Sequence, residues 1–147
     1  AKWKCNRMEL WNFLQLFWKS CREFEVRFAV VMSMVHFLDA EWFPLVCRMI
    51  DGLDYGRIHS YYRKEGKGAG TTGTYDHPTE KIKYGRALGE SPYYVRMAVA
   101  WLLATALAKL PDETRAYVNA SQLPADVIRL YVRKARESFR TRTVSPF

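Results

Sequence analysis

Val26-Arg27-Phe28-Ala29-Val30 is followed, 69 residues later, by Val95-Arg96-Met97-Ala98-Val99. Each copy leads into a long apolar helix pattern, then a short break and a second helix pattern. Because the surroundings match and four of the five letters are identical, we interpret the two stretches as copies of one repeating unit. The sequence therefore predicts an all-α fold built by stacking helix pairs.

The spacing of the two copies indicates which kind of stack this is. Removing an insertion of about 30 residues from the offset leaves a period near 40, which is typical of HEAT or armadillo helix pairs. We expect an α-solenoid of HEAT-like helix pairs that forms a single domain over residues 1–147. Helices are predicted over residues 9–19, 23–38, 41–53, 91–109, 111–119 and 124–140. Ser91 is the expected N-cap of the fourth, with Pro92 at its first position.

The first predicted helix has one apolar stripe with a tryptophan on either side of it. Leu10, Phe13, Leu14 and Phe17 recur at spacings of three and four, so we expect this stripe to face the core. Trp11 and Trp18 flank it. Together with Trp42, these tryptophans could form an exposed apolar docking patch. A helical-repeat module that binds another protein is therefore one functional hypothesis.

Residues 54–90 differ from the rest of the chain. Seven of the eight glycines lie in this stretch, and residues 66–73 contain almost nothing to bury. Glycine-rich segments disfavour helices. No P-loop spacing is present. We expect a Gly-rich loop inserted between the two repeats, either touching DNA as a flap or lying in solvent.

Charge is concentrated in the second half of the chain. The 147 residues have a formal net charge of +8, but residues 1–54 contain seven basic and seven acidic side chains. Residues 91–147 contain nine basic and four acidic ones. The composition excludes disorder, and no apolar run is long enough to span a bilayer. No signal-peptide pattern is present, so we expect a cytoplasmic protein without membrane partners.

No set of side chains forms a complete catalytic or metal-binding constellation. His36, His59 and His77 lack metal-ligand spacing, and we expect His36 to be interior. The serines lack a nucleophile-elbow setting, and the carboxylates lie mostly at helix starts. The sequence predicts no metal and no cofactor.

The last predicted helix contains the strongest basic pattern. Arg129, Arg133, Arg136 and Arg140 follow at i, i+4, i+7 and i+11, which places four guanidinium groups along one face. Lys134 and Arg142 add to this charge. Guanidinium groups bind phosphate oxygens in a bidentate manner, so such a row can follow a nucleic-acid backbone. The alternative is a solvated polar face.

Three residues in the repeated helices are also candidates. Arg27 and Arg96 hold the same place in their repeats, where each could face a ligand or pair with a nearby carboxylate. Trp101 lies on the same helix as Arg96. A tryptophan in an apolar helix usually belongs to the core, but beside a basic face it could stack on a sugar or base.

Longer strings indicate a resemblance to a known family. Glu25-Val26-Arg27-Phe28-Ala29-Val30-Val31-Met32 and Tyr93-Tyr94-Val95-Arg96-Met97-Ala98-Val99-Ala100-Trp101 are similar to motifs of the DNA alkylation repair family of HEAT-repeat DNA glycosylases. The stretch from Lys134 to Arg140 resembles that family's terminal helix. The resemblance covers residues 9–54 and 91–142.

The resemblance implies a curved solenoid whose basic concave face binds duplex DNA. Family members excise N3- and N7-alkylated purines by hydrolysing the N-glycosidic bond, without a metal or cofactor. By resemblance, Arg27 contacts the DNA backbone near the lesion and Trp101 packs against the lesion's sugar-phosphate. Because an alkylated purine is already a good leaving group, stabilising the positive charge on the sugar is the main task left to the protein.

One departure from the family concerns the catalytic aspartate. It lies in a W-x-x-C-D type segment, which Trp3-Lys4-Cys5-Asn6 does not match. We therefore expect this chain to correspond to the C-terminal portion of the family domain, without several of its N-terminal helices. Uncapped solenoid ends also predict self-association.

Overall fold

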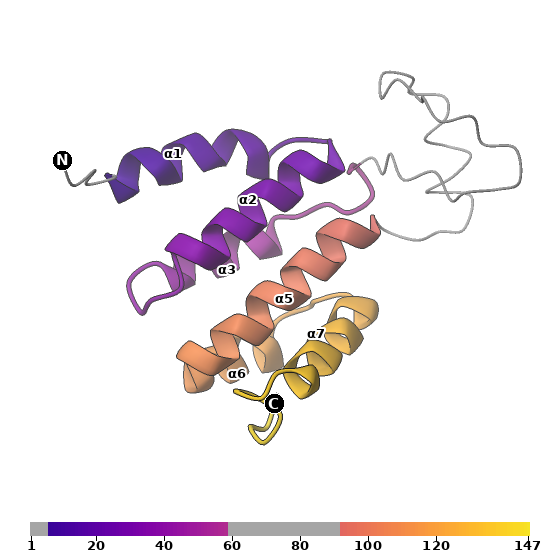
Figure 1. Cartoon of the computed structure of the whole chain (residues 1–147). Helices are drawn as coiled ribbons and strands as arrows, with labels where there is room; N and C mark the ends of the chain where they lie inside the picture. The colour runs from indigo at the N-terminus through magenta and orange to yellow at the C-terminus, as the bar shows by residue number, and fades with distance from the viewer. Residues whose placement is uncertain (1–5, 59–91) are drawn as a thin grey trace, which may run out of the picture.

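A computed structural model describes residues 6–58 and 92–147 of the chain. The described residues are helical and contain no strand, which confirms the all-α prediction for this part of the chain. The predicted Gly-rich insertion lies almost entirely outside the described residues. The helices are α1 (Arg7–Trp18), α2 (Glu23–His36), α3 (Phe43–Asp51), α5 (Tyr93–Lys109), α6 (Pro111–Ala120) and α7 (Ala125–Glu137) (Figure 1).

Helix α5 lies at the centre of the arrangement. It packs against α2 on one side and α7 on the other, and α1 packs on the far side of α2. Figure 1 shows these four helices following one another across the molecule, with α3 and α6 behind them. Side chains join the two rear helices: Phe43 contacts Tyr117 in an edge-to-face ring pair, and the Tyr117 hydroxyl donates to Asp51.

The two copies of the repeated sequence bury the same positions. Val26 and Val95 are fully buried, as are Val30 and Val99. Ala29 and its counterpart Ala98 are also in the core. These residues recur at spacings of three and four, so they line one face of α2 and the matching face of α5.

The core-facing stripe of α1 differs from the prediction. Trp11, Leu14 and Trp18 are buried, whereas Phe13 is exposed. Both stripes of this helix have helical spacing, so periodicity alone does not choose between them. Trp11 packs against Phe37 and Trp42 at centroid distances of 5.1 and 5.4 Å, and the large indole surface decides which face is buried.

These contacts contradict the tryptophan docking hypothesis. Trp11, Trp18 and Trp42 are all at most 9% exposed, so they do not form a surface patch. Arg7 covers this cluster, with its guanidinium carbon 5.3 Å from the ring centroids of Phe37 and Trp42. His36, expected inside, is exposed at the end of α2.

Polar side chains, which are not part of the apolar periodicity, set the ends of the helices. Asn6 starts α1 because its Oδ1 accepts from the Met8 N–H at 3.1 Å. Asp39 accepts from the backbone N–H groups of Glu41 and Trp42, which delays α3 until Phe43. Desolvation opposes the charge on Asp39, but hydrogen bonds from Arg7 and Trp42 hold its pKa below the usual value.

The start of α5 also differs from the expected Ser91 cap. The helix begins at Tyr93, and its N-cap residue Pro92 offers no side-chain acceptor. Glu23, fully buried at the start of α2, accepts instead from the Tyr94 N–H at 2.8 Å. A carboxylate here also complements the positive end of the α5 dipole.

Within the described residues, no helix has the length and apolar character needed to cross a bilayer.

Candidate nucleic-acid interface

Helix α7 has one buried face and one strongly basic face. Val127, Tyr131 and Ala135 face the core at spacings of four, and the Tyr131 hydroxyl donates to the Pro146 carbonyl at 2.8 Å. The opposite face carries exposed arginines. This division follows directly from the helical period of the apolar residues.

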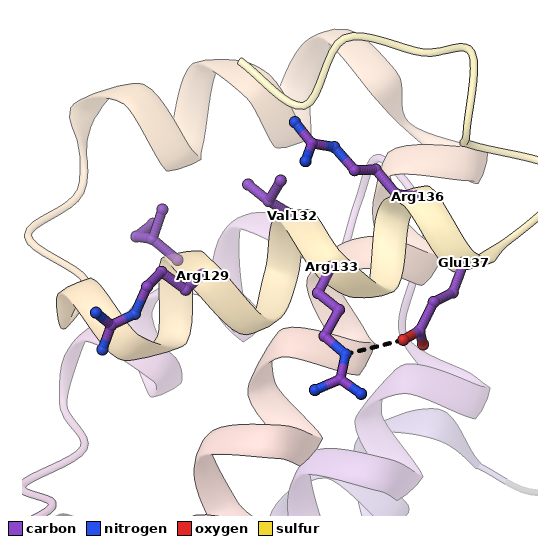
Figure 2. Close-up of a pocket in the computed structure, with 6 residues that line it drawn as sticks. Arg129, Val132, Arg133, Arg136 and Glu137 are labelled. Carbon is purple, nitrogen blue, oxygen red and sulfur yellow. Dashed lines mark hydrogen bonds and ion pairs between the residues drawn. The ribbon is translucent and has the colours of Figure 1, made fainter.

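Three of the four predicted arginines line one open depression of about 510 Å³ on α7 (Figure 2). They are Arg129, Arg133 and Arg136, and the first and last are seven residues apart, or about 10 Å along the helix at 1.5 Å per residue. Half-buried Ile128 and Val132 also line it. The surface therefore combines cationic groups with aliphatic ones.

Two of the basic residues on α7 share one carboxylate. Glu137 accepts from Arg133 Nε at 3.0 Å and from Lys134 Nζ at 2.9 Å. These hydrogen bonds, the one from Lys134 most strongly, hold the pKa of Glu137 below its usual value. Figure 2 shows Arg133 extending toward Glu137, while the Arg136 side chain extends away from both. Among the described residues, Arg129 and Arg136 form no ion pair, so their charge is not offset there.

The fourth predicted member of the row, Arg140, lies outside the helix. The prediction of a helix to residue 140 is wrong, because α7 ends at Glu137 and Ser138 is extended. The chain turns so that Thr141 becomes buried and its hydroxyl donates to the Ala135 carbonyl at 2.7 Å. The Arg140 guanidinium lies over the Phe139 ring, at 5.6 Å, and stays exposed.

Arg96 is not an exposed cation. Its side chain is only 9% exposed and forms a salt bridge with Asp126 in the first turn of α7. Of the two alternatives left open by the sequence, the structure favours pairing, with Asp126 rather than a glutamate of α2. We therefore remove Arg96 from the candidate DNA-binding set. The pair joins α5 to α7 at the end where both helices begin.

Tyr55 lies close to this ion pair. Burial raises the pKa of Tyr55, and the nearby Asp126 carboxylate raises it further, while the Arg96 charge lowers it. Sequence reasoning missed Tyr55 and did not pair Asp126 with Arg96. The sequence shows only that Asp126 is an acidic residue in the first turn of a predicted helix. Such a residue indicates helix capping more than an ion pair with another helix.

Arg27 and Trp101 remain accessible on the neighbouring helices. Arg27, on α2, is partly buried and places its guanidinium 5.7 Å from the Tyr94 ring centroid. Trp101 is 45% exposed, which contradicts a core position. Tyr93, Met97 and Trp101 recur every four residues, along the same side of α5.

Comparisons with known proteins add no relative: no family model, curated protein or solved structure matches the chain.

Proposed function

We propose that this chain is a DNA-binding solenoid of HEAT-like helix pairs, from a repair glycosylase acting on N3- and N7-alkylated purines. One observation carries the proposal: Arg129, Arg133 and Arg136 line a single open surface on α7, and the only nearby carboxylate in that lining is Glu137. Such a surface favours anionic groups such as phosphate oxygens over neutral partners.

The fold supports the repeat part of the proposal. We assign α2 and α3 to one proposed unit and α5 and α6 to the next, and the same sequence positions are buried in α2 and α5. In repeat proteins, neighbouring helix pairs bury a continuous core by stacking on one another. Here α2 packs on α5, and a ring of α3 contacts a ring of α6. We also propose that uncapped ends of such a stack allow the chain to self-associate.

The glycosylase part rests on the family resemblance and on Trp101. The exposed indole could pack against a deoxyribose while α7 binds the flanking phosphates. A non-catalytic DNA-binding module is the alternative, because no aspartate of this chain matches the family's catalytic one. Substrate chemistry and DNA binding therefore need separate measurements.

Binding to a duplex oligonucleotide tests the proposed interface. Arg129→Gln and Arg136→Gln should each weaken binding at low salt about 3- to 10-fold, because each loses one charge-assisted phosphate contact. Arg48→Gln is the matched control, since Arg48 is exposed on α3, away from α7. Equal affinities for all three variants and the original chain would contradict the proposed interface.

Release of free base from 7-methylguanine-containing duplex DNA tests the chemistry. Release that Trp101→Leu reduces would support the glycosylase proposal and would require a carboxylate of this chain to act. Binding without release would favour the non-catalytic alternative. The absence of both DNA binding and base release would contradict the glycosylase proposal and the non-catalytic alternative alike.

A further inference from the structure

Tyr93, the first residue of α5, is an exposed aromatic residue that the proposed α7 interface does not include. It is 47% exposed, and its hydroxyl forms no hydrogen bond within the part of the chain that the structure describes. Tyrosine has an apolar ring and a polar tip, which is why it is enriched at interfaces that are apolar at one end and wet at the other. Both parts of this side chain are therefore available to a ligand.

Two neighbouring side chains restrict the orientation of the Tyr93 ring. The guanidinium carbon of Arg96, one turn further along α5, lies 5.8 Å from the ring centroid. Such a cation is attracted to the face of the ring. The Tyr94 ring meets it edge to face, with the centroids 5.5 Å apart. Because Arg96 is itself held by Asp126, the position of the Tyr93 ring is tied to α7.

The salt bridge between Arg96 and Asp126 places Tyr93 beside the basic surface of α7. Asp126 lies one helical turn from Arg129 and two turns from Arg133, so the three residues share one side of α7. This side faces α5, because Asp126 contacts Arg96 there. Both helices begin near the salt bridge, and Figure 1 shows them side by side.

The charges around Tyr93 favour an anionic partner. The first turn of α5 contains no acidic residue, and the charge of Asp126 is balanced by Arg96. Glu23, which meets the start of α5, is fully buried. In protein–DNA interfaces, phosphate oxygens accept hydrogen bonds from tyrosine hydroxyls as well as from arginines. A hydroxyl beside Arg129 therefore suits the same phosphate backbone as the arginines of α7.

We infer that Tyr93 is a further DNA-contacting residue, whose hydroxyl donates a hydrogen bond to a phosphate oxygen of the backbone that follows Arg129 and Arg133. The inference rests on the proposed function, because the arginines of α7 bring the backbone to this place. It extends the interface from α7 onto α5 and adds a neutral donor to it. A neutral donor increases affinity without neutralising a phosphate, so it releases no counterion.

The substitution Tyr93→Phe removes only the hydroxyl and tests the inference. Anisotropy measures binding to a fluorescein-labelled 20-base-pair duplex at several salt concentrations. The variant should bind about 3- to 10-fold more weakly than the original chain, because it loses one hydrogen bond to a charged acceptor. The slope of log Kobs against log salt concentration should stay unchanged. Arg129→Gln, in contrast, should reduce the magnitude of this slope by about 0.9.

Tyr55→Phe is the matched control. It also removes a tyrosine hydroxyl near Arg96 and Asp126, but this hydroxyl is buried and does not reach DNA. The control should bind the duplex as tightly as the original chain, and circular dichroism and urea unfolding establish that both variants are folded. Unchanged affinity of folded Tyr93→Phe, or an equal loss in the control, would overturn the inference. A smaller salt slope in Tyr93→Phe would show that the substitution displaces the arginines, and would overturn it too.

A second duplex of different sequence separates a phosphate contact from a base contact. Loss of a phosphate contact weakens binding to both duplexes about equally. A loss confined to one duplex would assign the hydroxyl to a base edge and overturn the inference.

The same titrations separate this inference from the proposed function. Weaker binding by Arg129→Gln together with unchanged binding by Tyr93→Phe would overturn the inference alone. No binding of the original chain to either duplex would contradict the proposed function as well.

Discussion

Arg96 and Arg27 hold equivalent positions in the repeat but have different surroundings. Arg96 is buried against Asp126, whereas Arg27 is partly exposed beside Tyr94. The difference arises because α7 packs on α5 and supplies a carboxylate in its first turn. Four of the five letters, the arginine among them, are the same in both copies, so the sequence motif alone could not separate a structural arginine from an accessible one.

This difference predicts unequal costs of substitution. Arg96→Met should lower the free energy of unfolding by about 2–4 kcal/mol, because it leaves the Asp126 charge without its partner. Arg27→Met, the matched control, should cost less than about 1 kcal/mol. Urea unfolding monitored by circular dichroism measures both. Equal costs would show that the ion pair does not stabilise the contact between α5 and α7.

Helix α5 is the element on which the rest of the fold depends. Leu102, Leu103 and Leu107 are almost completely buried, and α2, α6 and α7 all pack against this helix. A helix that is apolar on most of its surface is expected at the centre of a helical protein.

The central position of α5 predicts a large effect of shortening one of its side chains. Leu103→Ala should destabilise the fold by about 2–5 kcal/mol through lost apolar contact and a cavity. Leu16→Ala, at a position 71% exposed on α1, should change stability by less than about 0.5 kcal/mol. Thermal and urea unfolding of the pair would check this. A small effect of Leu103→Ala would mean that the centre of the fold lies elsewhere.

At the scale of elements, apolar periodicity predicted the number, type and order of the described helices. It failed where packing chose between two equally regular stripes, as in α1, and where a polar side chain set an end. Asn6, Asp39 and Thr141 each fix a boundary through a hydrogen bond to the backbone. The spacing of the arginines predicted the row on α7. Arg140 does not belong to it because the helix ends at Glu137, where the chain turns to bury Thr141.

Across the whole molecule, several ionisable groups are kept neutral by burial. Burial, and then the Asp51 charge, raise the pKa of Cys47 to about 12. Burial likewise raises the pKa of Tyr131 to about 12, despite the opposing charge of Arg115. In an unfolded chain these groups ionise near pH 8.5 and 10. The folded state therefore binds their protons more tightly than the unfolded state does.

Linkage turns these shifts into an alkaline limit on stability. The contribution of Cys47 and Tyr131 is complete below about pH 8 and is lost as pH rises toward 12, because only the unfolded chain releases these protons in that range. Unfolding in urea should show stability falling by about 1–3 kcal/mol between pH 8 and 10.5. Tyr131→Phe and Cys47→Ala together should flatten this decline. A decline of the same steepness in the double variant would assign it to other groups.

If the arginines of α7 bind the phosphate backbone, duplex binding depends on salt concentration through them. Each phosphate contact contributes about 0.9 to the slope of log Kobs against log salt concentration. The Arg129→Gln, Arg136→Gln double variant should therefore show a slope smaller in magnitude by about 2 than that of the original chain. An unchanged slope in a folded double variant would show that these arginines do not contact phosphates and would contradict the account.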